Sequence, residues 1–296
     1  MTVLVTGANG FLGQYLCTSL ASKGFTVVAT SRGKCRFANL NNIKYLLLNL
    51  INEAEIAVII KAEKPDIVIH NAAMSKPDAC EKDGRECMVQ NVNTTMFLMK
   101  ACEKIKPHFI YISTDFVFGE NGPHAEDTEI EVLPLNLYGK SKLLAEQMVQ
   151  KSALPFTIVR PVFIYGKLLS GMKPTFIHWV QTNLKNGQSI KVVIDQQRTP
   201  TFVNDICDGI FAIIDKKAEG IFHLAGKDLI SPYAMAVTVA TVLGLDASLI
   251  EPVTSETFFE PVKRAKKSGL KIDKAKEILG YNPVSFEDGV RLSFGV

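Results

Sequence analysis

The chain has 296 residues, of which 47% are hydrophobic and 21% are charged, and its net charge is +3. This composition is typical of a soluble globular protein, and so small a net charge gives no support to binding of nucleic acid or of a membrane surface. The sequence starts directly on an apolar run, with no basic leader and no long hydrophobic segment. We therefore expect a cytoplasmic protein without a membrane span.

The first 165 residues alternate apolar runs with segments of helical periodicity. Runs that are apolar at consecutive positions suit strands buried on both faces of a parallel sheet. The predicted strands lie at 2–6, 25–30, 43–49, 66–71, 108–113 and 156–160. The predicted helices between them lie at 11–22, 52–63, 85–104 and 138–150. This βαβ series predicts a doubly wound, Rossmann-like α/β fold with helices on both faces of a parallel sheet.

After residue 165 the pattern becomes more mixed. We expect residues 1–165 to form a dinucleotide-binding domain and residues 166–296 to form mainly a smaller, mixed α/β substrate lobe. The chain is expected to return to the main sheet near 200–225. The predicted helices and strands of this part lie at 174–186, 190–195, 203–216, 220–225 and 231–243.

Cysteines and basic residues show no ligand pattern. The six cysteines form neither a C-x-x-C motif nor a Cys/His spacing typical of zinc sites. We therefore expect reduced thiols, no disulfide framework and no metal site. The dense basic run KRAKK at 263–267 is predicted to be a solvated loop.

The first predicted strand runs into TGANGFLG, in which Gly7, Gly10 and Gly13 follow the spacing G-x-x-G-x-x-G. Glycines at such a turn let the backbone approach a pyrophosphate and let the next helix pack closely on the strand. That helix directs its N-terminal N–H groups at the phosphates. Glycine triplets also occur in ordinary turns. Placed between the first strand and the first helix of a βαβ series, this one favours a dinucleotide site.

The end of the second predicted strand indicates which dinucleotide is bound. An acidic residue there hydrogen-bonds the ribose of NAD, whereas an arginine accommodates the 2′-phosphate of NADP. The segment ATSRGKCR contains Ser31 and Arg32 and no acid. We therefore expect NADP(H), with NAD(H) as the alternative, and a purely solvated Arg32 as the competing interpretation. NAAM at 71–74, after the fourth predicted strand, places small residues where such a sheet holds its ligand.

Polar residues follow the fifth predicted strand, where Ser113, Thr114 and Asp115 interrupt an apolar run. A hydroxyl at this edge of the sheet can reach a carbonyl beside a nicotinamide, although such clusters also end strands for conformational reasons alone. Tyr138 and Lys142 follow one βα unit later, four residues apart and therefore on one helical face. Because an ammonium group favours a nearby phenolate, we expect Lys142 to lower the pKa of Tyr138, as general acid–base catalysis requires.

Gly139 lies inside the same predicted helix, where a glycine costs about 1 kcal/mol relative to alanine. We expect its small size, with that of Ser141, to let the helix backbone lie close to a neighbouring element. Leu137, Leu144 and Met148 form the predicted buried stripe of this helix.

Taken together, the motifs resemble those of extended short-chain dehydrogenases/reductases. The matching segments are TGANGFLG, NAA, STDFVFG, PLNLYGKSK, and RP followed by YG at 160–166. Two later segments, QQRTPTFVNDI and LKIDKAKEILGYNP, narrow the resemblance to the dTDP-4-dehydrorhamnose reductase family over nearly the whole chain. In that family a hydroxyl residue, a tyrosine and a lysine form the catalytic triad. They fall here on Thr114, Tyr138 and Lys142.

The resemblance also implies a reaction and two sets of contacts. The reaction is NAD(P)H-dependent reduction of the 4-keto group of a nucleotide-linked deoxysugar, from dTDP-4-dehydrorhamnose to dTDP-rhamnose. The expected partner is thus a nucleotide sugar, and a homodimer is allowed. The implied substrate contacts are Ser113, Asp115, Asn136, Arg198 and Thr201. Besides Tyr138 and Lys142, the implied cofactor contacts are Gly7, Asn9, Gly10, Phe11, Leu12, Gly13, Ser31, Arg32, Asn49, Leu50, Asn71, Ala72 and Ala73.

Some positions depart from the family pattern. Asn49 stands where an aspartate is usual near the adenine, and Ala265 follows Arg264 where a proline is common. Phe116 follows Asp115 where a dehydratase would carry a glutamate, which argues against dehydration. Two alternatives stay open. One is a non-catalytic regulatory subunit, because the β subunit of methionine adenosyltransferase resembles the same family. The other is an epimerase or dehydrogenase of another nucleotide sugar.

Overall fold

A seven-stranded parallel sheet forms the centre of the computed structural model, which describes residues 1–128, 130, 134–257 and 262–296. Its strand order is β3-β2-β1-β4-β5-β6-β10. The order reverses between β1 and β4, which confirms the predicted doubly wound α/β fold. The strands are β1 (Thr2–Thr6), β2 (Thr26–Ser31), β3 (Ile43–Leu47), β4 (Ile67–His70), β5 (His108–Ile112), β6 (Phe156–Arg160) and β10 (Gly220–His223).

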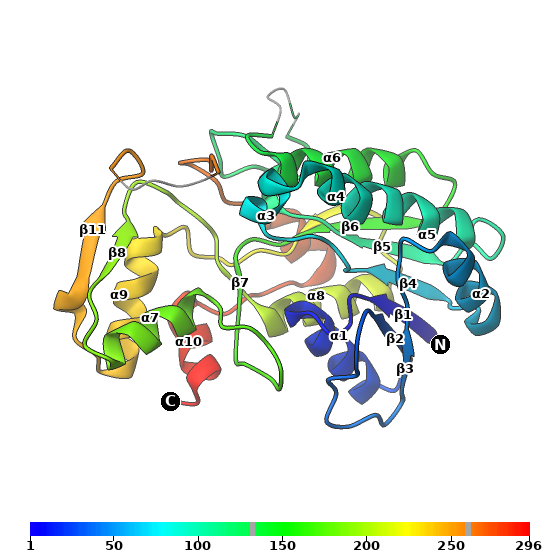
Figure 1. Cartoon of the computed structure of the whole chain (residues 1–296), viewed down its shortest axis with the longest axis horizontal. Coiled ribbons are helices and arrows are strands. Elements are labelled where there is room, and N and C mark those ends of the chain that lie inside the picture. Colours follow the sequence, from blue (N-terminus) through cyan, green and yellow to red (C-terminus); the bar gives the residue numbers. More distant parts are fainter. Residues whose placement is uncertain (129, 131–133, 258–261) are drawn as a thin grey trace.

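Helices cover both faces of this sheet because the strands are apolar at consecutive positions. Val3 and Val5 of β1 face one hydrophobic core, whereas Leu4 between them faces the other. The first core is closed by α1 and α8, and the second by α2, α5 and α6. Figure 1 shows α5 and α6 above the sheet and α1 and α8 below it. These helices are α1 (Phe11–Ser22), α2 (Glu53–Glu63), α5 (Thr94–Cys102), α6 (Leu137–Gln150) and α8 (Val203–Lys216).

A smaller lobe with its own core lies beside the sheet, at the left of Figure 1. Val180, Met235 and Val290 lie in that core, and β8 and β11, which pair in parallel, contribute residues to it. The chain returns to the main sheet in α8 and β10, where β10 pairs with β6. The elements of the lobe are α7 (Phe176–Lys185), β8 (Ile190–Val193), α9 (Pro232–Leu243), β11 (Ile250–Val253) and α10 (Phe286–Phe294). The two-residue strands β7 (Ile164–Tyr165) and β9 (Thr201–Phe202) pair between the two parts.

The helix predicted at 85–104 is broken into three segments. They are α4 (Gly84–Met88), a π-helical turn η1 (Val89–Asn93) and α5, and the short helix α3 (Pro77–Lys82) precedes them. The wider turn is where Asn91, which is buried, points its carboxamide inward.

One local prediction needs correction. In α6, Leu137 and Met148 are half-buried, but Leu144 is 42% exposed, so the predicted stripe was wrong at Leu144. The helix instead buries the face that carries Tyr138 and Lys142. The basic run at 263–267 exposes its lysine side chains outside helices and strands, which confirms the predicted solvated loop, while its main chain is hydrogen-bonded on both sides.

None of the helices within the described ranges combines the length and the apolar character needed to cross a bilayer. All six cysteines are free thiols, and five of them are buried. Burial raises the pKa of the Cys102 thiol to about 12, which keeps it protonated and unreactive.

Candidate active site

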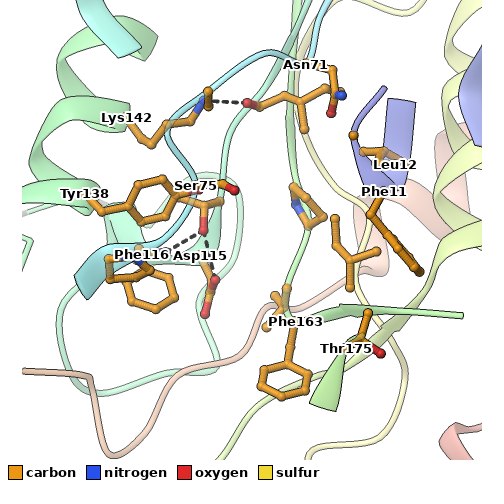
Figure 2. Close-up of a pocket in the computed structure, with 18 of the residues that line it drawn as sticks. Phe11, Leu12, Asn71, Ser75, Asp115, Phe116, Tyr138, Lys142, Phe163 and Thr175 are labelled. Atoms are coloured by element: carbon orange, nitrogen blue, oxygen red, sulfur yellow. Dashed lines mark hydrogen bonds between the residues drawn. The ribbon is translucent and has the colours of Figure 1, made fainter. Parts of the chain in front are cut away.

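A cavity of about 840 Å³ runs along the carboxyl ends of β1 to β6, between the sheet and the smaller lobe. An open parallel sheet binds ligands at this edge, where its strand order reverses. Figure 2 shows Tyr138 and Lys142 reaching in from α6, opposite Phe11 and Leu12 at the start of α1. The residues predicted from the sequence that line the cavity are Gly7, Gly10, Phe11, Leu12, Ser31, Arg32, Leu50, Asn71, Ala72, Ala73, Ser113, Thr114, Asp115, Tyr138, Lys142 and Arg198.

The glycine turn after β1 is packed so tightly that side chains do not fit. Gly7 has φ +66°, and a Cβ there would lie 2.8 Å from the Cα of Ala72. A Cβ on Gly13 would collide with the carbonyl oxygen of Gly7, so Gly13 serves the packing of α1 and does not line the cavity. The first turn of α1 has N–H groups without intrahelical partners, and its residues Phe11 and Leu12 face the cavity. The turn is thus suited to a pyrophosphate.

The edge of the cavity beyond β2 carries Ser31 and the exposed Arg32. Asn9 does not line the cavity. Its Nδ2 donates to the carbonyl oxygen of Lys34 at 2.9 Å and to the hydroxyl of Tyr45 at 2.8 Å. Asn9 therefore holds the loop that presents Arg32.

Two further predicted contacts lie away from the cavity. Thr201 is fully buried in β9, where its hydroxyl donates to the carbonyl oxygen of Val162 at 2.7 Å. Asn49 is half-buried and its Oδ1 accepts from the backbone N–H of Ile51 at 3.5 Å, while its neighbour Leu50 lines the cavity. Both side chains are hydrogen-bonded to the main chain, and neither lines the cavity.

The start of α6 is fixed against the segment that follows β5. Asn136 is the N-cap of α6, and its Oδ1 accepts from the N–H of Gly139 at 3.0 Å. Gly139 lies so close to the carbonyl oxygen of Phe116 that a Cβ would collide with it. This contact presses the first turn of α6 onto the residues after Thr114 and so brings Tyr138 beside Thr114. The predicted close approach of the helix backbone at Gly139 is thus confirmed, and the element that it approaches is the backbone of Phe116.

Replacing Gly139 with alanine is expected to destabilise the protein by about 1–3 kcal/mol through overpacking, although alanine is the better helix former. Because the added methyl pushes α6 away from Phe116, kcat should fall as well. Urea unfolding and steady-state kinetics check this, with Lys140→Ala as the control on the exposed side of the same turn. A Gly139→Ala variant that is more stable than wild type would show that there is room for a methyl group between Gly139 and Phe116.

Thr114, Tyr138 and Lys142 meet in the cavity, and all three are buried, with relative exposures of 6%, 7% and 2%. The hydroxyl of Thr114 donates to Oδ1 of Asp115 at 3.1 Å. The Nζ of Lys142 donates to the carbonyl oxygen of Ile112 at 2.7 Å and lies 4.0 Å from the centre of the Tyr111 ring. The three side chains therefore surround a single polar space at the end of β5.

Burial dominates the titration of this site. It raises the pKa of Tyr138 above the ordinary value, while the neighbouring hydroxyl of Thr114 acts in the opposite direction. The direction expected from the sequence, a pKa lowered by Lys142, is therefore wrong for the protein without ligands. Burial also lowers the pKa of Lys142 to about 7, against the opposing effect of the Glu146 carboxylate. Tyr138 is thus protonated at neutral pH, as a proton donor must be.

The predicted substrate contacts differ in how free they are to reach a ligand. Ser113 lines the cavity, and its buried hydroxyl has no hydrogen-bond partner in the described structure. Asn136 lies outside the cavity, and its Nδ2 donates to the carbonyl oxygen of Lys263 at 3.0 Å. Arg198 lines the cavity but its Nη1 also donates to the carbonyl oxygen of Ala265 at 2.8 Å.

Sequence reasoning missed the part of the cavity that the smaller lobe supplies. Trp179 is 41% exposed on α7, and its being the single tryptophan of the chain is the signal in the sequence that could have identified it. Gln196 and Arg264 lie in segments that the sequence had singled out, but neither was predicted as a contact. The lining residues of this part include Phe163, Thr175, Phe176, Trp179, Lys191, Gln196, Pro232 and Arg264.

Asn91 is a further residue that the sequence did not indicate. Its Oδ1 accepts from the N–H of Met74 at 2.7 Å, and its Nδ2 donates to the hydroxyl of Ser141 at 2.9 Å. That hydroxyl in turn donates to the carbonyl oxygen of Tyr138 at 2.7 Å. Asn91 therefore ties the segment after β4 to the helix that carries Tyr138.

Comparison with known proteins identifies the family. The family model of the RmlD substrate binding domain matches residues 1–294. The spore coat polysaccharide biosynthesis protein SpsK of Bacillus subtilis is 28% identical, over 98% of this chain and 95% of its own. Methionine adenosyltransferase 2 subunit beta of Danio rerio is also 28% identical, over 98% of this chain and 88% of its own. The dTDP-4-dehydrorhamnose reductase of Bacillus anthracis, solved in complex with NADP, has a TM-score of 0.86 at 26% identity, covering 99% of this chain and 98% of that one. The chain therefore belongs to the RmlD substrate binding domain family, as its resemblance to dTDP-4-dehydrorhamnose reductases predicted.

Proposed function

We propose that the protein is an NADP(H)-dependent oxidoreductase that reduces the 4-keto group of a nucleotide-linked deoxysugar, converting dTDP-4-dehydrorhamnose to dTDP-rhamnose. The observation that carries this proposal is the burial of Thr114, Tyr138 and Lys142 in the cavity that also contains the glycine turn. The related reductase of Bacillus anthracis was solved with NADP, which supports the cofactor. NAD(H) is the alternative.

The residues around the glycine turn fit a dinucleotide. Gly7 and Gly10 line the cavity with backbone that carries no side chain, and the start of α1 would hold the pyrophosphate. Arg32 would bind the 2′-phosphate, and Lys142 would bind the hydroxyls of the nicotinamide ribose. When bound, the reduced cofactor supplies a hydride.

The protein's own part in the reaction is to supply and orient a proton. Tyr138 donates the proton of its hydroxyl to the sugar O4 as the ketone becomes an alkoxide, and the hydride adds to C4, so that a secondary alcohol results. The raised pKa of Tyr138 keeps this proton in place before the reaction. Thr114 hydrogen-bonds the same oxygen, and a charged Lys142 stabilises the phenolate that Tyr138 leaves behind.

The composition of the cavity wall favours reduction over dehydration. Asp115 is the one carboxylate among the described residues that line the cavity. The next residue, Phe116, turns its ring edge-to-face with Tyr138 at 5.5 Å between centroids. Loss of water from a sugar needs a second acid or base at this place, and an aromatic ring cannot supply one.

A regulatory subunit is the second candidate, because methionine adenosyltransferase 2 subunit beta of Danio rerio is as similar in sequence as SpsK. The two functions predict different behaviour. A regulatory subunit would bind the dinucleotide and a partner enzyme without turning over a sugar, since a fold and its site can persist without the reaction.

The test is NADPH and NADH oxidation with a panel of dTDP-, GDP- and UDP-linked 4-ketosugars. We expect turnover with dTDP-4-dehydrorhamnose and NADPH. If only a GDP- or UDP-linked sugar is turned over, the protein is still a reductase but its substrate differs from the one proposed. If no sugar of the panel is turned over and the protein binds methionine adenosyltransferase tightly, the protein is a regulatory subunit and not a reductase.

Replacing Arg32 with alanine is expected to weaken NADPH binding roughly tenfold or more, because charge-assisted hydrogen bonds to the 2′-phosphate are lost. NADH binding should change less than about twofold, since NADH carries no such phosphate. Fluorescence titration of both cofactors checks this. Lys34→Ala is the control, because Lys34 is an exposed neighbouring cation that does not line the cavity. Equal weakening of both cofactors by Arg32→Ala would remove the preference for NADP.

A further inference from the structure

Residues 262–271, hereafter the strap, include the basic run and lie between the two parts of the protein. On one side, the backbone N–H groups of Lys266 and Lys267 donate to the carboxylate of Glu120 at 2.8 and 3.1 Å. On the other side, the N–H of Gln197 donates to the carbonyl oxygen of Lys266 at 2.7 Å. The strap is thus fixed both to the segment after β5 and to the segment that carries Arg198.

Two side chains of the strap are connected to the candidate active site. Arg264 lines the cavity directly, and Ser268 is connected to it through Asp115. Ser268 is 7% exposed, and its hydroxyl donates to Oδ2 of Asp115 at 2.6 Å. The other oxygen of Asp115, Oδ1, accepts from the hydroxyl of Thr114 at 3.1 Å. Thr114 lines the cavity together with Tyr138. A hydrogen-bonded chain of three side chains therefore leads from the strap to the cavity wall that carries Tyr138.

Asp115 is the central residue of this hydrogen-bonded chain, and both of its carboxylate oxygens accept hydrogen bonds. A buried carboxyl group is costly unless its oxygens are hydrogen-bonded, and Asp115 is 5% exposed. Burial raises the pKa of Asp115, while Arg198, Ser268 and Thr114 act against this effect. Each oxygen of Asp115 accepts a hydrogen bond from a protein hydroxyl. Ser268 therefore fixes the orientation of the Asp115 carboxylate, and the carboxylate in turn fixes the orientation of the Thr114 hydroxyl.

We propose that Ser268 is a positioning residue of the active site, which acts through Asp115 to hold the Thr114 side chain in its place beside Tyr138 on the cavity wall. This assigns Asp115 an orienting role in place of the substrate contact expected from the sequence. It also makes the strap a part of the active site. The proposal rests on the proposed reductase function, in which Thr114 contacts the reacting oxygen.

The test compares Ser268→Ala, Ser268→Thr and Asp115→Asn by steady-state kinetics with dTDP-4-dehydrorhamnose and NADPH. Ser268→Ala should lower kcat about tenfold, the effect of one lost hydrogen bond to a charged group. KM for the sugar and Kd for NADPH should change less than about twofold, because Ser268 contacts neither ligand. Ser268→Thr should restore kcat, and the double variant Ser268→Ala/Asp115→Asn should be no slower than Asp115→Asn alone.

Ser255→Ala is the matched control. Ser255 donates to Oδ2 of Asp195 at the same distance of 2.6 Å, but this pair lies in the smaller lobe and does not line the cavity. Its kcat should equal that of wild type. Wild-type kcat in Ser268→Ala, or a loss that Ser268→Thr does not restore, overturns the proposal.

A crystal structure of Ser268→Ala separates this proposal from the proposed function. If wild type turns over no 4-ketosugar, the proposed reductase function is wrong. The crystal structure of the variant still shows whether Ser268 positions Thr114. The Thr114 hydroxyl should have moved away from Tyr138 in the variant. An unchanged position of Thr114 and Asp115 overturns the positioning role.

Discussion

Replacing Tyr138 with phenylalanine is expected to lower kcat by about a thousandfold, within the range that general acid catalysis contributes. The phenol hydroxyl is the proposed proton donor, and Tyr138 is the one tyrosine among the described residues that line the cavity. NADPH affinity should change little, because the ring remains and fills the same volume. Steady-state kinetics and fluorescence titration of NADPH measure the two effects.

Tyr281→Phe is the matched control for this substitution. Tyr281 is buried like Tyr138, and its hydroxyl donates to the carbonyl oxygen of Ala225 at 3.1 Å, but it does not line the cavity. Its kcat should stay within about twofold of wild type, as for a buried hydrogen bond away from the reacting atoms. A Tyr138→Phe variant with more than a tenth of wild-type kcat would remove Tyr138 from the role of proton donor.

Replacing Glu146 with glutamine is expected to lower the free energy of unfolding by about 3–5 kcal/mol. Glu146 and Arg160 form a buried two-pronged ion pair, with Nη2 to Oε2 at 2.6 Å and Nε to Oε1 at 2.9 Å. The side chains are 0% and 3% exposed. Loss of the carboxylate leaves the guanidinium buried without a counter-charge. Urea unfolding monitored by circular dichroism measures the change.

Glu287→Gln provides the comparison at an exposed site. Glu287 pairs with Arg291 at 2.8 Å on α10, and the two side chains are 57% and 47% exposed. This variant should change the free energy of unfolding by no more than about 0.5 kcal/mol, because exposed pairs contribute little. If the two variants were equally destabilised, the pair between α6 and β6 would not be a fixed part of the fold.

The central sheet could be predicted because its strands carry their signal locally. The run from Thr2 to Thr6 is apolar at consecutive positions, and the structure buries Val3, Leu4 and Val5 completely. The π-helical turn around Asn91 could not be predicted, since the residues of 85–104 keep a helical periodicity through it. In α6 the apolar spacing pointed to Leu144, but contacts with η2 (Asp115–Val117) set the rotation of the helix, so a tertiary contact overrode the local pattern.

The residues of the candidate active site likewise fall into some that the sequence could predict and some that it could not. The glycine turn, Thr114 and the Tyr138–Lys142 pair each lie at the end of a strand or on one helical turn, so their spacing indicates a shared location. Ser268 is more than 150 residues from Asp115 in sequence, and no local pattern connects them. The direction of the Tyr138 pKa was mispredicted because burial, which the sequence does not specify at one residue, raises this pKa, and the charge of Asp115 acts in the same direction.

Hydride transfer to the sugar is tested most directly with NADPH that carries deuterium at both C4 positions of its nicotinamide, and dTDP-4-dehydrorhamnose. We expect one deuterium at C4 of the product sugar for each NADPH oxidised, seen by mass spectrometry and NMR. NADPH oxidation without deuterium at that carbon, or no oxidation at all, would contradict the proposed reduction.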